Sequence, residues 1–173
     1  MARYGLIVVF SSERRRTYPY RLCETMGVAI LGGHAEEVAS RLAMPAYPLG
    51  YVSDPEHVAQ AFTVADVFVL PSLEDNLPNT IMEAMACAVP CVGFRTGGIP
   101  EMIDHLKNGY VANAYDADDL ARGLNYVLYE ADYDSLIDKC LNKVARCYSQ
   151  QSVARRYVEV YEQALHPKKH RKR

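Results

Sequence analysis

Short apolar runs alternate with amphipathic stretches over the first two thirds of the chain. The run Leu6-Ile7-Val8-Val9-Phe10 has no polar position and predicts a strand that is buried on both faces. Further strands are predicted at residues 28–31, 47–52, 66–70, 91–94 and 110–112, and helices at residues 34–42, 55–64 and 79–88. This alternation is typical of an α/β fold with a Rossmann-like parallel sheet, right-handed crossovers and helices on both faces.

The last third of the chain has only helical periodicity. Asp116 is a good N-cap, with Asp119 three residues later as a short analogue of a capping box. Two further helices are expected at residues 132–148 and 153–165. We expect residues 1–166 to form a single domain with trailing helices, and residues 167–173 to be a disordered basic tail.

The composition is that of an ordinary globular protein. Half of the 173 residues are hydrophobic and 23% are charged, and no apolar run approaches the roughly 20 residues of a membrane helix. The apolar stretch at residues 5–10 is too short for the core of a signal peptide, so we expect a cytoplasmic protein. The five cysteines form no C-x-x-C pair, which favours reduced, mostly buried thiols over a disulfide framework or a metal site.

Charge is distributed unevenly along the chain. The net charge is −2, yet the tail at residues 168–173 carries five of the 19 lysines and arginines. Such a tail is compatible with nucleic-acid or anionic-lipid contact, but the body is acidic and no other segment interleaves basic with aromatic residues. We therefore expect a solvated terminus and no nucleic-acid partner.

The best-marked candidate site is the loop that follows the strand at residues 66–70. Ligands of open parallel sheets bind at the carboxyl ends of strands, beside helix N-termini. The loop Asp75-Asn76-Leu77-Pro78-Asn79-Thr80 leads into a helix that is expected to begin near Pro78, and the free N–H groups there attract phosphate. Glu83 should lean back over Asn79 and Thr80, where its carboxylate can accept two hydrogen bonds from a ribose, and Asp75 can hold another polyol.

The simpler explanation is that acids near a helix start complement its dipole, and spacing alone favours it. The length of the loop and a second turn favour a binding site instead. In that second turn, Gly97-Gly98 lets the backbone approach a ligand closely, before Pro100 starts a short helix. A third turn carries Arg14-Arg15-Arg16, which either neutralise a diphosphate or form a solvated basic surface.

Four segments resemble the C-terminal domain of retaining GT-B glycosyltransferases of the large family 4 group. They are GYVSD at 50–54, ADVFVLPSLEDNLPNTIMEAMACAVPCVGF at 65–94, GGIPEMI at 97–103 and NGYVA at 108–112. The segments recur in family order with near-family spacing, and residues 148–165 resemble the family's C-terminal helix. The resemblance implies the Rossmann-like, donor-binding half of a two-domain enzyme.

The family mark is a pair of acidic residues with seven residues between them, a spacing that Asp75 and Glu83 share. By resemblance, Asp75 contacts hydroxyls of the transferred sugar, N–H groups near Leu77 to Thr80 face the diphosphate, and Glu83 binds the ribose of the nucleotide. Glu74 stands one position too early, although the two neighbouring acids can exchange roles. Weaker candidates for the same ligand are Gly33 and Tyr51 for the base, and Arg14, Arg15 and Arg16 for the diphosphate.

Two departures from the family pattern bear on function. Ala88 stands where the family usually has glycine, and the family's basic residues after the first strand have no clear counterpart. The N-terminal, acceptor-binding domain also has no counterpart. We therefore expect a fragment, a partner domain on a separate polypeptide, or a chain that is inactive alone.

The resemblance thus predicts the donor-binding part of a hexosyl-type glycosyltransferase. The intact enzyme is expected to transfer a sugar from a UDP- or GDP-sugar to an acceptor hydroxyl with retained configuration, in polysaccharide or glycoconjugate biosynthesis. The expected partners are the nucleotide sugar and an acceptor-binding domain in cis or in trans, through which alone a membrane would be contacted. No cofactor or metal is expected, and no catalytic residue is assigned within this chain. The alternative is a non-catalytic module that binds a nucleotide sugar or a partner protein.

Overall fold

The computed structural model describes residues 6–10 and 27–166. The elements follow in the order β1 (Leu6–Phe10), β2 (Gly27–Leu31), α1 (Ala35–Arg41), β3 (Ala46–Gly50), α2 (Pro55–Thr63), β4 (Val67–Leu70), α3 (Asn79–Ala86), β5 (Cys91–Phe94), α4 (Ile99–Met102), β6 (Gly109–Ala112), α5 (Ala117–Asn125), the π-helical η2 (Tyr126–Glu130), α6 (Tyr133–Lys143), the π-helical η3 (Val144–Tyr148) and α7 (Gln150–Leu165). Every predicted strand and helix is present, with ends that differ by a few residues. The basic tail lies outside the described residues.

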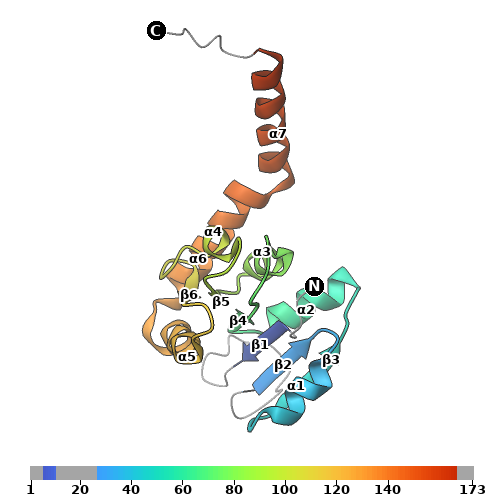
Figure 1. Ribbon diagram of the computed structural model, residues 1–173, viewed down its shortest axis with the longest axis vertical. Helices are drawn as coiled ribbons and strands as arrows, with labels where there is room; N and C mark the ends of the chain where they lie inside the picture. Colours follow the sequence, from blue (N-terminus) through green and yellow to red (C-terminus); the bar gives the residue numbers. More distant parts are fainter. Residues whose placement is uncertain (1–5, 11–26, 167–173) are drawn as a thin grey trace.

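The six strands form one sheet in the order β3-β2-β1-β4-β5-β6 (Figure 1). The pairs β2–β3, β4–β5 and β5–β6 are parallel, whereas β1 is antiparallel to both β2 and β4. The five other strands therefore share one direction, and the predicted parallel arrangement fails only at β1. An apolar run fits the middle of a sheet in either direction, so its pattern holds no information on the strand's direction.

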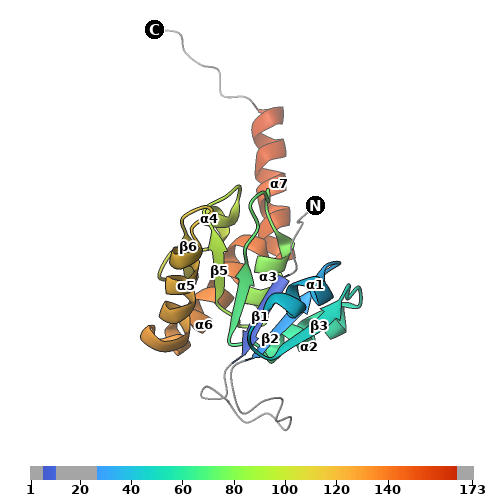
Figure 2. The same cartoon turned by 60° about the horizontal axis from the view of Figure 1, so that its bottom comes forward.

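Successive strand residues face two different cores. One core joins alternate strand residues to side chains of α2, α3, α4 and α6, among them Phe62 and Ile81. The other joins the intervening strand residues to α1, η2 and α6, among them Ala35 and Val127. Helices therefore cover both faces of the sheet, as the alternation of strands and helices predicts (Figure 2).

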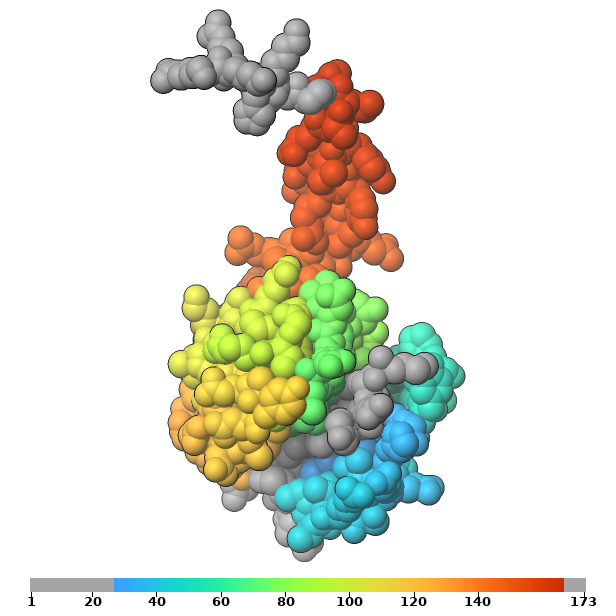
Figure 3. Space-filling view, in the orientation of Figure 1, coloured from blue at the N-terminus to red at the C-terminus, as the bar shows by residue number. Residues whose placement is uncertain are grey.

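The helix α7 extends away from the rest of the domain (Figures 1 and 3). The Ser149 hydroxyl caps its start by accepting the N–H of Ser152, but none of its residues is buried. Its exposed large side chains are Tyr157, Val158, Val160, Tyr161 and Leu165. Within the described ranges, no helix is both long enough and apolar enough to span a bilayer.

Candidate functional site

Four turns lie at one edge of the sheet. They follow the carboxyl ends of β2, β3, β4 and β5, which run in the same direction, and the turn after β6 lies at this edge as well. Two of these turns, at residues 71–78 and 95–98, connect neighbouring strands to α3 and α4. This is the edge at which an open α/β sheet binds its ligands.

The turns after β4 and β5 touch through their backbones. The N–H of Gly98 donates to the carbonyl oxygen of Asp75 at 3.3 Å. A Cβ added to Gly97 would lie 1.6 Å from that same oxygen, and a Cβ added to Gly98 would lie 2.0 Å from the carbonyl oxygen of Asn76. Gly97 also has a φ of 48°, in the left-handed region. The glycine pair is therefore needed for close contact between two loops, a partner that the sequence did not indicate.

A second link between these turns is made by side chains. The Thr96 hydroxyl donates to the carbonyl oxygen of Ser72 at 3.0 Å. The Ser72 hydroxyl, which is buried, in turn donates to the carbonyl oxygen of Glu74 at 3.1 Å. Together with the glycine contact, these bonds position the loop that carries Asp75 relative to α4.

The start of α3 has no side-chain cap. Pro78 occupies the N-cap in an extended conformation, so the helix begins at Asn79, as predicted. Buried side chains of Ile81, Ala84 and Met85 hold the opposite face of α3 on the core. The packing of this face fixes the position of α3. The first N–H groups of the helix donate to no capping side chain and are therefore available to bind an anion.

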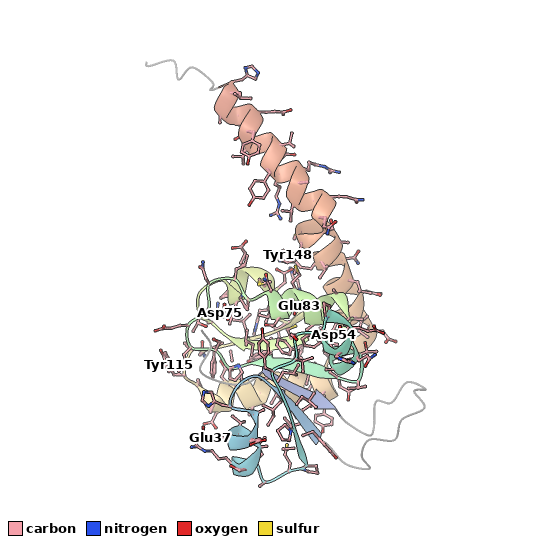
Figure 4. The ribbon with its side chains drawn as sticks, turned by 90° about the vertical axis from the view of Figure 1, so that its right-hand side faces the viewer. Glu37, Asp54, Asp75, Glu83, Tyr115 and Tyr148 are labelled. Carbon is pink, nitrogen blue, oxygen red and sulfur yellow. The ribbon has the colours of Figure 1, made fainter. Side chains whose placement is uncertain are left out.

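Asp75 and Glu83 lie on the same side of the domain, away from Glu37 on α1 (Figure 4). Asp75 is half-buried in the loop, and Glu83 is exposed on α3, one turn after Asn79. Within the described part of the chain, neither carboxylate takes part in an ion pair or accepts a hydrogen bond. The first turn of α3 contains no acidic residue, so Glu83 lies too far along the helix to be explained by the dipole.

The turns after β2 and β3 are also joined to each other. The N–H of Gly32 donates to the carbonyl oxygen of Gly50 at 2.7 Å, and both glycines have a positive φ. This contact brings Gly33 and Tyr51 to the same edge of the sheet, where Gly33 is exposed and the Tyr51 side chain is 85% exposed. The geometry thus gives conformational roles to Gly32 and Gly50, which flank the predicted residues.

The predicted arginine turn, Arg14-Arg15-Arg16, lies outside the described residues. Phe10, at the end of β1, pairs with Gly27, at the start of β2. Because β1 is antiparallel, it ends at the edge opposite to the Asp75 turn, whereas the predicted parallel strand would have ended beside it. The sequence contained no signal for this reversal.

A further acidic site, missed in the sequence, lies between β6 and α5. The Asp119 carboxylate is buried and accepts hydrogen bonds from the Tyr110 hydroxyl at 2.8 Å and the Asn113 N–H at 2.7 Å. Arg122 forms an ion pair with it at 3.3 Å. The Asn113 N–H, followed by the Tyr110 hydroxyl, lowers the pKa of Asp119. The predicted cap at Asp116 is confirmed, since its carboxylate accepts the Asp119 N–H at 2.9 Å.

The four described cysteines are free thiols. Burial raises the pKa of Cys140 to about 12 and also raises that of Cys91. Burial, followed by the charge of Glu83, raises the pKa of Cys87. The thiols of Cys87, Cys91 and Cys140 are therefore neutral at physiological pH. Among the described residues, no group of three or more histidine, cysteine or acidic side chains has the arrangement of a metal site.

Comparison with known proteins places this geometry in a family. The sequence profile described as Glycosyl transferases group 1 matches residues 21–130, which is more than half of the chain. N-acetyl-alpha-D-glucosaminyl L-malate synthase of Bacillus anthracis is 27% identical over 123 residues, which make up 70% of this chain and 32% of that protein. The putative colanic acid biosynthesis glycosyltransferase WcaL of Salmonella typhimurium is 35% identical over 111 residues, which make up 58% and 27% of the two chains.

Solved structures give the same picture for the fold. Anabaena Alr3699/HepE in complex with UDP-glucose superposes with a TM-score of 0.66 at 18% identity, over 78% of this chain and 40% of that chain. The chain spans about a third of the length of the curated relatives it matches. On the profile match and the fold together, the chain belongs to the glycosyl transferases group 1 family, and its fold is that of the C-terminal domain of a GT-B glycosyltransferase.

Proposed function

We propose that this chain binds a nucleotide diphosphate sugar at residues 75–83 and is the donor-binding domain of a retaining, hexosyl-type glycosyltransferase. The observation that supports the proposal is an uncapped helix start next to two carboxylates that have no hydrogen-bond or ion-pair partner among the described residues. A helix N-terminus attracts a diphosphate, and carboxylates accept hydrogen bonds from hydroxyl groups. The solved relative HepE contains UDP-glucose, which carries both kinds of group.

Each part of the donor is assigned to one part of the edge. The N–H groups of Asn79 and Thr80 bind the diphosphate, and the Glu83 carboxylate accepts the hydroxyls of the ribose. Asp75, held by the turn after β5, accepts hydroxyls of the sugar. Gly33 and Tyr51 lie on the two joined turns that border the base.

The domain, which we take to be residues 1–166, orients the donor and offsets the negative charge on the leaving diphosphate. The acceptor hydroxyl comes from an acceptor-binding domain in cis or in trans, and the product is a polysaccharide or glycoconjugate. The donor is a UDP- or GDP-sugar.

Calorimetry with UDP and UDP-glucose tests the ribose assignment. We expect Glu83→Ala to weaken the binding of both ligands about tenfold or more, because a charge-assisted pair of hydrogen bonds is lost. Glu159→Ala, at an exposed position of α7, is the matched control and should bind like the wild type. Equal affinities for the wild type and Glu83→Ala would contradict the assignment.

A module that binds the donor without turnover is the alternative, because the described edge supplies binding groups and no residue that we assign to the chemical step. The release of UDP and free glucose from UDP-glucose separates the two proposals. Slow hydrolysis that is reduced in Glu83→Ala supports a transferase domain. Tight UDP-glucose binding with no release above the rate in buffer supports the binding module.

A further inference from the structure

A groove of about 360 Å³ lies at the edge of the sheet opposite to the Asp75 turn. It is lined by Asp104 and Lys107 from the loop before β6, and by Lys139, Asn142, Lys143 and Arg146 from α6 and η3. Lys107 comes just before Gly109, the first residue of β6, which pairs with Cys91, the first residue of β5. The groove is therefore at the amino ends of the strands and shares no residue with the proposed donor site. We call it the basic groove.

The basic groove concentrates positive charge on a chain whose net charge is −2. Four cationic side chains line it, against a single carboxylate. Lys143, with 17% of its side chain exposed, pairs with Asp104 at 2.9 Å. Within the described residues, Lys107, Lys139 and Arg146 form no ion pair, and Lys139 donates only to the Ser135 hydroxyl at 2.8 Å.

The ion pair of Lys143 and the helix dipoles do not account for all four cations. Lys139, Lys143 and Arg146 recur at helical spacing along the rod formed by α6 and η3, so like charges face each other and oppose helix formation. Lys143 and Arg146 lie in the last turns of α6 and η3 and complement the dipoles of those helices, but Lys139 lies more than two turns before the end of η3 at Tyr148. Lys107 belongs to a loop on the other wall and has no dipole to complement.

We propose that the basic groove binds a phosphate group. Arg146 supplies a planar, bidentate donor to the phosphate oxygens, and Lys107 and Lys139 supply flanking charges from opposite walls. The Asn142 amide adds a neutral donor, and the Asp104–Lys143 pair ties the loop to α6. The volume is near the lower end of the range for ligand pockets, which fits a phosphorylated small molecule or the phosphate of a lipid headgroup.

An amide NMR titration of the full chain with inorganic phosphate and pyrophosphate tests the proposal. We expect saturable shifts at Lys107, Asn142 and Arg146, and binding that weakens as the salt concentration rises. Arg146→Gln should weaken the binding about tenfold, because it removes the bidentate contact. Arg155→Gln makes the same change of charge on the exposed face of α7 and should titrate like the wild type.

Equal phosphate affinity in the wild type and Arg146→Gln would overturn the proposal. So would shifts confined to Asn79 and Thr80, a result that would leave the proposed donor site intact. Arg146 is exposed, so thermal melting should show that its replacement leaves the fold unchanged. Co-sedimentation with phosphatidylcholine vesicles, with and without phosphatidic acid, then shows whether the bound phosphate belongs to a lipid headgroup or to a soluble molecule. Vesicle binding that needs both phosphatidic acid and Arg146 indicates a lipid headgroup, and binding of free phosphate alone indicates a soluble ligand.

Discussion

The turn between β4 and α3 and the turn between β6 and α5 both lead from a parallel strand into a helix, and both carry acidic residues. In the first turn, Asp75 and Glu83 have no partner within the described part of the chain. In the second, Asp119 accepts two hydrogen bonds and pairs with Arg122. The difference separates a carboxylate that is free to bind a ligand from one that holds the fold.

The two turns are also held together differently. The first is positioned from outside, by the backbone of Gly97 and Gly98 and by the Thr96 hydroxyl. The second is positioned from within, by the Asp119 carboxylate itself. We therefore expect replacement of an acidic side chain to destabilise the fold at the second turn more than at the first.

Replacing Gly97, which contacts the first turn, should have the largest effect on stability. Gly97→Ala places a methyl group 1.6 Å from the carbonyl oxygen of Asp75, in a residue whose φ is positive. We expect the free energy of unfolding to fall by about 3 kcal/mol, since overpacking and the left-handed conformation both contribute. Binding of UDP should weaken as well, because the loop that carries Asp75 must move. Denaturant titration and calorimetry measure the two effects.

The matched control for that change is Gly33→Ala. A Cβ added there meets no atom within 4 Å. The free energy of unfolding should therefore change by no more than about 0.5 kcal/mol. Similar stabilities for the two variants would refute the contact between the turns.

Removing the charge of the second turn should have the next largest effect. Asp119→Asn should lower the free energy of unfolding by about 1–3 kcal/mol, because the buried network loses its negative charge and one of its two accepting oxygens. UDP affinity should be unchanged. Asp118→Asn, at the exposed neighbouring position, should cost less than about 1 kcal/mol through the dipole alone. Loss of UDP binding in Asp119→Asn would break the distinction between the two turns.

The stabilising effect of Asp119 should depend on pH. Its pKa in the folded state is lowered, so folding favours the ionised form. The contribution is complete above the unfolded pKa of about 3.9, and it is lost as the pH falls through the folded value. The stability difference between the wild type and Asp119→Asn should therefore shrink in acid. A difference that stayed constant to pH values below about 3 would contradict this assignment.

Asp75→Asn should have a smaller effect, confined to the sugar. We expect UDP-glucose to bind about fivefold to tenfold more weakly, because an amide oxygen accepts a hydroxyl hydrogen bond less strongly than a carboxylate does. UDP itself, which lacks the sugar, should bind within about twofold of the wild type. Calorimetry with both ligands provides the comparison. An equal loss of affinity for UDP-glucose and UDP would indicate that Asp75 contacts the nucleotide and not the sugar.

The smallest effect is expected at the far end of α3. Ala88 has a φ of 63°, which a glycine adopts without strain. Ala88→Gly should therefore raise the free energy of unfolding by about 0.5–1 kcal/mol, without changing UDP affinity. Ala121→Gly, within α5, should instead lower it by about 1 kcal/mol. Thermal denaturation of the two variants tests whether the backbone conformation decides if a glycine raises or lowers the free energy of unfolding.

Much of the fold could be predicted because its signals are local. Apolar runs marked the strands, and a carboxylate before a helical pattern marked the cap at Asp116. The binding roles of Asp75 and Glu83 rest on the resemblance to the family and stay a prediction. The direction of β1 could not be predicted, because an apolar run fits a buried strand either way. The partners of Asp119 could not be predicted either, since Tyr110 lies on β6 and Asn113 in the loop after it, and how that loop folds back onto α5 is not encoded in a local pattern.

The sequence by itself determined the order of the elements, the two apolar faces of the sheet and the residues of the Asp75–Glu83 turn, because each depends on the periodicity of a short segment. Only the tertiary structure decided what surrounds those residues. It brought Gly97 against Asp75, placed the carboxylates of Asp75 and Glu83 where no described residue pairs with them, enclosed Asp119, and gathered the cations of two distant segments into the basic groove. The contact of Gly97 with Asp75 and the lining of the basic groove join residues that are remote along the chain. The energies of all these contacts arise only when the packed domain brings the residues together.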